Sequence, residues 1–204
     1  MGYTTDFIGH VDIAPALNEA EIAYLSAFSA SRRWERPGGP YAVPGNPRAD
    51  EVRPVRGNGY NVPASGQPGL WCDWVPCWDG CCLAYNGVEK FYGAVEWLRY
   101  LIDHFLRPAA QASYAGDEAF GEFTFDHVLE GMVVGCRRDN KELFAITVQD
   151  NRVRQQVLRP ADRRFRDYPP LPYEAAIDRN LSPGQRRRRE REGQVLPFIR
   201  RDGT

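Results

Sequence analysis

The segment from Gly69 to Leu106 constrains the fold more than any other part of the chain. It contains four of the five tryptophans and four of the five cysteines. Side chains in residues 70–75 alternate between two sets, which is the period of a β-strand. Asp79-Gly80 favours a tight turn, and a return strand is expected over residues 81–85. The segment therefore predicts a β-hairpin at the structural centre.

A long helix is predicted after this hairpin. Asn86 is a suitable N-cap residue, because its side-chain oxygen can accept a hydrogen bond from a backbone N–H of the first turn. Apolar residues then recur at spacings of three and four, which places them on one helix face. They are Val88, Phe91, Val95, Leu98, Ile102 and Phe105. Pro108 is expected to end the helix, because proline has no backbone N–H to donate.

The N-terminal part of the chain predicts a strand followed by a second helix. Residues 6–14 alternate as a strand does, although Gly9 weakens the pattern. Asn18 and Glu21 have the spacing of a capping box, in which each side chain accepts a hydrogen bond from the other residue's backbone N–H. The helix that follows is expected to end near Arg32-Arg33.

Two more strands are predicted after the long helix, at residues 123–134 with an irregularity at Gly131 and at residues 143–148, with a turn at Asp139-Asn140. The element order is then strand, helix, strand, strand, helix, strand, strand. An α+β fold satisfies this order with short connections. We expect an antiparallel sheet with two helices on one face, similar to the ferredoxin-like plan with an extra hairpin.

The length of 204 residues is enough for one domain with extensions. We expect a single domain over residues 1–158. Residues 35–68 form a loop rich in proline and glycine, and loops of this length are usually functional or disordered. Residues 159–204 form a Pro/Arg-rich tail, which we expect to be mobile or to depend on a partner.

Charge and cysteine content argue against several classes of protein. The formal net charge of −1 gives no overall field that would attract nucleic acid or an acidic membrane. No apolar run reaches the roughly 18–20 residues that span a bilayer, and the N-terminus lacks a secretory signal pattern. An odd number of cysteines, with Cys81 and Cys82 adjacent, fits reduced thiols better than a disulfide framework. We expect a cytoplasmic protein with no membrane partner.

The cysteines are the sharpest candidates for a metal site, because thiolates select zinc and a hairpin can bring several together. The spacing C-x4-C-x3-C from Cys72 to Cys81 differs from the short paired spacings of zinc fingers and ribbons. Cys82 is expected to point away from Cys81 if both lie in a strand. Buried small hydrophobic residues explain the cysteines better, so we expect no metal and no cofactor.

Candidates for catalysis are less specific. A cysteine or serine nucleophile needs a base, and the histidines are His10, His104 and His127, which are interpreted as structural or surface residues. Asp73 or Glu89 could act as a general acid or base, but no spacing singles out a carboxylate pair. No phosphate-binding glycine motif occurs.

Three short motifs resemble those of a known group of proteins. They are Met1-Gly2-Tyr3-Thr4-Thr5-Asp6-Phe7, the sequence GQPGLWCDWVP at residues 66–76, and Glu89-Lys90-Phe91-Tyr92. Together they are similar to a family of small uncharacterised proteins of bacteria and bacteriophages, over most of residues 1–153. The family has no established activity, so the resemblance assigns no catalytic residue. It implies a role in host interaction or counter-defence, and it leaves Cys77, Cys81, Cys82 and the basic tail as additions in this chain.

The leading hypothesis is a non-enzymatic binding protein for a protein partner or a small ligand. Large exposed aromatic residues usually mark an interface, so the proposed surface is an aromatic face of the sheet together with the Pro/Gly-rich loop. The proposed binding residues are Trp71, Asp73, Trp74, Trp78, Glu89 and Lys90.

Two alternatives stay open. One is a small hydrolase or transferase that uses Asp73 or Glu89 as acid or base, with the long loop as a lid. A deep pocket with such a carboxylate beside His10 or His127 would favour it. The other is a nucleic-acid accessory protein that acts through the arginine-rich run at residues 186–191, which the interleaved glutamates disfavour. The sequence does not specify the oligomeric state.

Overall fold

The computed structural model describes residues 3–36, 38–45, 61–162, 180 and 182–185. Most of the tail predicted over residues 159–204, including its arginine run, lies outside the described residues, as does the middle of the Pro/Gly-rich loop. The chain divides into one unit from Met1 to Arg163 and a second from Arg164 to Thr204. All the elements described below belong to the first unit.

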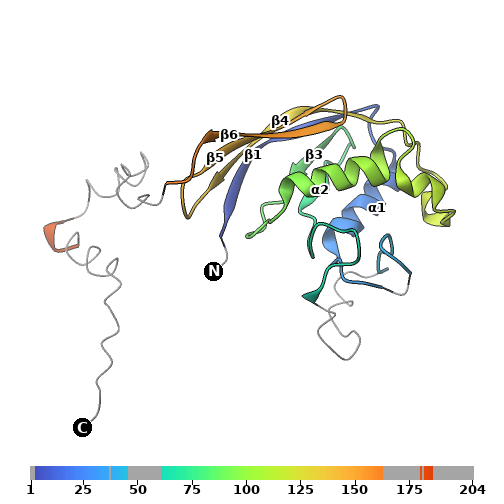
Figure 1. The fold of residues 1–204 in the computed structure, drawn as a ribbon, viewed down its shortest axis with the longest axis horizontal. Coiled ribbons are helices and arrows are strands. Elements are labelled where there is room, and N and C mark those ends of the chain that lie inside the picture. The colour runs from blue at the N-terminus through green and yellow to red at the C-terminus, as the bar shows by residue number, and fades with distance from the viewer. Residues whose placement is uncertain (1–2, 37, 46–60, 163–179, 181, 186–204) are drawn as a thin grey trace, which may run out of the picture. The chain divides into compact units, whose positions relative to one another are not determined.

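Six antiparallel strands form one sheet (Figure 1). Their order across the sheet is β2-β3-β1-β4-β5-β6. Their bounds are Thr5–Ala14 for β1, Trp74–Pro76 for β2, Cys82–Tyr85 for β3, Val128–Arg137 for β4, Leu143–Gln149 for β5 and Arg152–Arg159 for β6. The longest pairing joins β1 to β4 over the whole length of both strands. The α+β class and the antiparallel sheet expected from the sequence are confirmed.

The helices are α1 (Glu19–Ala30), α2 (Ala94–Leu101) and a π-helical turn, η3 (Ile102–Leu106), that continues α2. Two short 3-10 turns follow, η4 (Gln111–Tyr114) and η5 (Glu118–Phe120). One buried cluster joins the helices to the inner face of the sheet. It includes Val11, Leu25, Phe28, Leu83, Trp97, Leu98, Phe105, Leu129, Val133 and Ile146.

The helix ends follow the predicted local signals. Asn18 Oδ1 accepts a hydrogen bond from Glu21 N at 3.0 Å, and Glu21 Oε2 accepts one from Asn18 N at 2.8 Å. This is the predicted capping box, and α1 begins directly after Asn18. At the other end of the helical region, η3 ends shortly before Pro108, as the sequence predicted.

The long helix nevertheless begins later than predicted. Its first residue is Ala94, and the residues between Asn86 and Ala94 form a loop. Within that loop Gly87, Lys90 and Gly93 have φ angles of 83°, 68° and 71°. Such left-handed backbone cannot be part of a right-handed α-helix. The prediction of Asn86 as the N-cap was therefore wrong.

Two strands also differ from the prediction. β2 is shorter than expected, because residues 70–73 precede the ladder. β6 was not predicted, because this edge strand is polar and largely exposed and shows no apolar alternation. The preceding Asp150 and Asn151 have φ angles of 48° and 63°. These are the positive angles of a type I′ hairpin turn, so the Asp-Asn dipeptide was the available signal for β6.

β4 begins at Val128 instead of residue 123. Phe125 has a φ of 49°, which interrupts the extended backbone before the strand. Inside β4, Gly131 has a φ of 146° and lies opposite Val11 of β1. A Cβ atom at this position would come within 2.8 Å of the carbonyl oxygen of His10. Glycine is therefore required there, and the predicted irregularity at Gly131 is confirmed.

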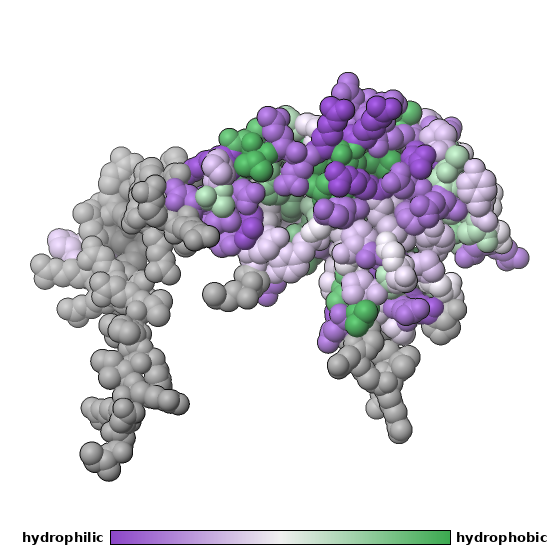
Figure 2. Space-filling view, in the orientation of Figure 1, coloured by the Kyte–Doolittle hydropathy of each residue, from purple (hydrophilic) through white to green (hydrophobic). Residues whose placement is uncertain are grey.

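The outer face of the sheet, turned away from the core, carries no Phe, Trp or Tyr side chain on any of the six described strands. Along β1 its outward residues are Asp6, Ile8, His10, Asp12 and Ala14. Figure 2 shows that hydrophobic surface on the visible side of the molecule occurs in patches separated by hydrophilic residues. The prediction of an aromatic binding face on the sheet was therefore wrong.

No described helix is both long and apolar enough to cross a membrane.

Candidate functional site

A pocket of about 710 Å³ lies at the open end of the β2–β3 hairpin. The end of α1, the loop that leads into β2, and the loop that leads into α2 form its walls. Its apolar lining includes Pro63, Pro68, Leu70, Trp71, Val88 and Tyr92. The volume is within the roughly 300–1,000 Å³ of small-molecule sites.

Four of the six residues proposed from the sequence line this pocket. They are Trp71, Asp73, Glu89 and Lys90. They come from the two segments that flank the β2–β3 hairpin, which the antiparallel pairing of β2 with β3 brings together. The structure therefore places these four residues at one site.

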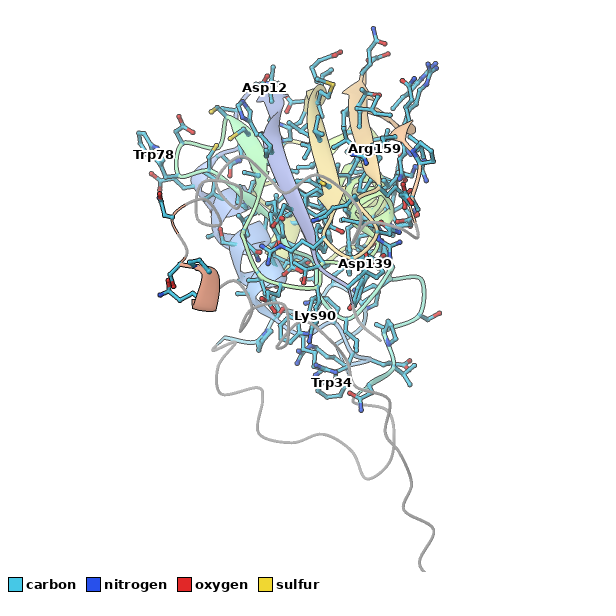
Figure 3. The ribbon with its side chains drawn as sticks, turned by 90° about the vertical axis from the view of Figure 1, so that its left-hand side faces the viewer. Asp12, Trp34, Trp78, Lys90, Asp139 and Arg159 are labelled. Carbon is cyan, nitrogen blue, oxygen red and sulfur yellow. The ribbon has the colours of Figure 1, made fainter. Side chains whose placement is uncertain are left out.

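The other two proposed residues lie elsewhere. Trp74 is 0% exposed, and its indole Nε1 donates a hydrogen bond to the carbonyl oxygen of Ala94 at 2.8 Å. It is a core residue, because the alternation along β2 turns it inward. Trp78 is 90% exposed in the turn between β2 and β3. Figure 3 shows Trp78 pointing outward on a part of the molecule separate from Lys90.

Asp73 and Asn86 face each other across the open end of the hairpin. Asn86 donates its backbone N–H to the Asp73 carbonyl at 3.0 Å and its Nδ2 to Asp73 Oδ1 at 3.1 Å. Burial raises the pKa of Asp73, and the hydrogen bond from Asn86 offsets this rise only in part. Among the described residues, the second carboxyl oxygen of Asp73 has no hydrogen-bond partner. That oxygen is available to a ligand.

Trp71 forms one aromatic wall of the pocket and is contacted by Arg32. The guanidinium of Arg32 lies 5.6 Å from the centre of the Trp71 ring, a cation–π distance. Arg32 also donates a hydrogen bond to Asn61 Oδ1 at 2.7 Å. This contact ties the end of α1 to the loop that precedes β2, so the wall has a fixed position.

Buried Arg33 supports the same wall from the protein interior. Its guanidinium donates to Ser31 Oγ at 2.8 Å, to the Pro40 carbonyl at 2.7 Å and to Gln67 Oε1 at 3.3 Å. Its backbone N–H donates to the carbonyl of Leu70, which lines the pocket, at 2.8 Å. Burial lowers the pKa of Arg33 to about 10, so the side chain stays charged at neutral pH. The described part of the Pro/Gly-rich loop is thus fixed to the pocket wall.

None of the histidines lines the pocket. His10 is on the outer face of the sheet, with Nε2 3.2 Å from Asp12 Oδ1. His127 is buried and lies 3.1 Å from Glu21 Oε1. His104 belongs to η3, where burial lowers its pKa. The pocket therefore presents carboxyl groups without an imidazole beside them.

A second cluster of reactive side chains lies at the turn of the same hairpin. The sulfur atoms of Cys77, Cys81 and Cys82 all lie within 4.8 Å of one another. Cys82 was expected to point away from Cys81 only if both lie in a strand, and this condition is not met because Cys81 precedes β3. Cys72 is fully buried, and Cys136 belongs to β4.

Sequence reasoning missed Asn86 and Tyr92 as pocket residues. Asn86 was interpreted as a helix cap, and Tyr92 was assigned to the helix itself. For Tyr92 the available signal was the motif Glu89-Lys90-Phe91-Tyr92, of which Glu89, Lys90 and Tyr92 line the pocket. Asn86 lies in neither motif, and no sequence signal pointed to it as a pocket residue.

The chain matches no protein-family model, no curated protein and no solved structure. Function must therefore be inferred from the pocket and from the groups that line it.

Proposed function

We propose that this protein binds a small organic molecule in the pocket beside Trp71 and Asp73. One observation carries the proposal: a cavity of about 710 Å³ combines an aromatic wall with a buried carboxyl group that keeps one oxygen free. A few polar groups converging in a mainly apolar cavity are the usual composition of a ligand site. The supports behind Trp71 and Leu70 favour a site formed before the ligand arrives.

The groups in the pocket favour a ligand with N–H donors. Asp73 and Glu89 supply two carboxyl groups, and Lys90 supplies one ammonium group. The free Asp73 oxygen can accept an N–H bond, and hydrogen bonds to charged groups are the stronger ones. The rings of Trp71 and Tyr92 suit an aromatic or cationic group. We infer a flat apolar molecule with an ammonium or amidinium group at one end.

A hydrolase or transferase is the second candidate function. The raised pKa of Asp73 favours it, because a carboxyl group whose pKa lies nearer the working pH is a better general acid or base. The acid–base groups that such an enzyme would have in the described pocket wall are Asp73, Glu89, Lys90 and Tyr92. Without a histidine at the site, we place binding ahead of catalysis.

The finer proposals about this chain rest on separate observations. The strand order β2-β3-β1-β4, with β5 and β6 beside β4, supports the ferredoxin-like plan with an extra hairpin. The core shared by α1 and α2 supports two helices on one face of the sheet. A cytoplasmic location is proposed from the cysteine content, and a link to bacteriophages from the motif resemblance alone.

The ligand class can be tested with two matched pairs of small molecules. We expect benzamidine and tryptamine to bind the full-length protein in isothermal titration calorimetry. Benzoate and indole-3-acetate have similar shapes but carry an anion, and we expect them to bind about 10-fold more weakly or worse, which corresponds to about 1.4 kcal/mol. Equal binding of benzamidine and benzoate would contradict the assigned ligand chemistry.

Two pairs of variants locate the site. Asp73→Asn should weaken benzamidine binding by about 10-fold or more, because it removes a charge-assisted hydrogen bond. Asp12→Asn, on the outer face of the sheet, is the control and should have no effect. Trp71→Ala should weaken tryptamine binding, whereas Trp78→Ala should leave it unchanged. If Trp78→Ala is the damaging variant, the ligand surface lies at the hairpin turn and the pocket proposal fails.

A further inference from the structure

The turn of the β2–β3 hairpin gathers three thiols that the ligand pocket does not use. Cys77 follows β2, Cys81 precedes β3, and Cys82 is the first residue of β3. Their sulfur atoms lie within 4.8 Å of one another, and the sulfurs of Cys77 and Cys81 are 3.6 Å apart. All three are free thiols. Such convergence in one short turn is a binding arrangement for a soft metal ion.

The spacing of the sulfur atoms fits metal ligation. A tetrahedral zinc ion with Zn–S bonds of about 2.3 Å holds its sulfur ligands roughly 3.8 Å apart. The 3.6 Å between the sulfurs of Cys77 and Cys81 is close to this separation. It is far longer than the roughly 2.05 Å of a disulfide bond.

Backbone hydrogen bonds hold the turn in this conformation. Cys77 N donates to the Cys82 carbonyl at 2.9 Å, and Gly80 N donates to the Cys77 carbonyl at 3.1 Å. The turn is also attached to the body of the protein, because Leu17 N donates to the Gly80 carbonyl at 3.0 Å. Gly80 has a φ of 73°, and a Cβ atom there would lie 2.5 Å from the Leu17 carbonyl oxygen. The thiols are thus held on a fixed scaffold.

The polar surroundings of the sulfur atoms suit a cation. The backbone N–H of Cys82 donates to Cys77 Sγ at 2.9 Å, which is the kind of contact that stabilises a thiolate ligand. Asp79 Oδ1 lies 3.0 Å from Cys77 Sγ and adds a carboxylate beside the cluster.

The cluster is open to solvent on one side. Cys81 is exposed, and Cys77 and Cys82 are partly exposed. A metal ion can therefore enter without unfolding, and a fourth coordination position remains for Asp79 or water. Three thiolates with an oxygen ligand nearby match zinc better than a hard cation such as magnesium.

We propose that Cys77, Cys81 and Cys82 form a zinc site at the turn of the β2–β3 hairpin. The site is separate from the ligand pocket, which lies at the other end of the same hairpin. Its existence does not depend on what the pocket binds.

The test uses the reduced full-length protein, loaded with zinc chloride and dialysed, with elemental analysis of the retained metal. We expect one zinc ion per chain. Cobalt loaded in its place should give the intense thiolate-to-metal absorption of a sulfur-ligated site. Loss of a residue that only hydrogen-bonds to a metal ligand lowers metal affinity by roughly 10- to 100-fold. Cys81→Ser removes a ligand itself, so it should lower zinc affinity by more than this. Cys136→Ser on β4 is the matched control and should retain the metal.

Three results would overturn the proposal. The first is a reduced wild-type protein that retains no zinc. The second is retention of zinc by Cys81→Ser and by a Cys77→Ser, Cys82→Ser double variant, each checked for folding by circular dichroism. The third is a Cys77–Cys81 disulfide that peptide mass spectrometry finds in freshly purified protein and whose two cysteines bind no zinc after the disulfide is reduced.

Discussion

Replacement of His127 by alanine is expected to lower the free energy of unfolding by about 3–5 kcal/mol, measured by urea denaturation. His127 Nε2 lies 3.1 Å from Glu21 Oε1, and both side chains are buried. Nδ1 of the same ring lies 2.8 Å from the Pro15 carbonyl oxygen, so both ring nitrogens face acceptors. Loss of the imidazole leaves the Glu21 carboxylate buried without its counter-charge, and this accounts for the large effect.

The matched control is His10→Ala, because His10 is an exposed histidine on the outer face of the sheet. We expect its effect to stay within about 0.5 kcal/mol. Glu21→Gln keeps the size of the side chain and removes its charge, so it should also be destabilising. A loss below about 1 kcal/mol for His127→Ala would mean that the pair is not a stabilising ion pair.

The same pair predicts how stability changes with pH. Burial raises the pKa of Glu21, but hydrogen bonds from His127, Thr124 and Asn18 outweigh it and hold the pKa below its ordinary value of 4.5. Burial lowers the pKa of His127, but Glu21 and the Pro15 carbonyl outweigh it and raise the pKa above 6.5.

Glu21 sets the acidic limit, and His127 the basic limit, of the pH range in which their ion pair stabilises the fold. The carboxylate contribution is complete above about pH 4.5 and is lost as the pH falls through the lowered pKa of Glu21. The imidazolium contribution is complete below about pH 6.5 and is lost as the pH rises through the raised pKa of His127. The stability difference between wild type and His127→Ala should therefore be largest between these two values.

Replacement of Trp74 by alanine is expected to cost about 3–5 kcal/mol of stability, because it empties a large buried site. The Trp74 ring lies 5.9 Å from the ring of Phe7 and 5.6 Å from that of Phe91. Its Nε1 hydrogen bond to the Ala94 carbonyl fixes the start of α2 against β2. Denaturation in urea measures the loss.

Trp78→Ala provides the comparison, because Trp78 lies in the turn of the same hairpin and is exposed. Its effect on stability should stay within about 0.5 kcal/mol. If Trp74→Ala does not fold, Trp74→Phe retains most of the ring and still leaves the Ala94 carbonyl without its donor. We expect that variant to cost about 1–3 kcal/mol. Equal stability of Trp74→Ala and Trp78→Ala would show that Trp74 is not a core residue.

Elements with strong local signals were predicted from the sequence. The capping box of Asn18 and Glu21 depends on two residues three positions apart, so it is visible without knowledge of the rest of the chain. The loop before α2 was missed because its apolar residues keep a helical spacing, while the left-handed backbone at Gly87, Lys90 and Gly93 breaks the helix. Spacing shows which residues can share a face, but not whether the backbone follows a helix.

The candidate site was predicted only in part, because sequence spacing does not show which way a side chain faces. Trp71, Asp73, Glu89 and Lys90 were named from two separate segments, and the pairing of β2 with β3 brings them to one pocket. Trp74 was named with them, yet it packs in the core. Alternation in a strand separates side chains into two sets, but it does not tell which set faces the helices. Only the order of the whole sheet decides this.

The sheet is poorly suited to accept another strand at either edge. β2 has only three residues and includes Pro76, which has no N–H to donate to a neighbouring strand. At the opposite edge, β6 carries Arg152, Arg154 and Arg159, and an identical strand that approached it would meet like charges. Both edges of the described sheet therefore disfavour edge-to-edge pairing with a second copy of the chain.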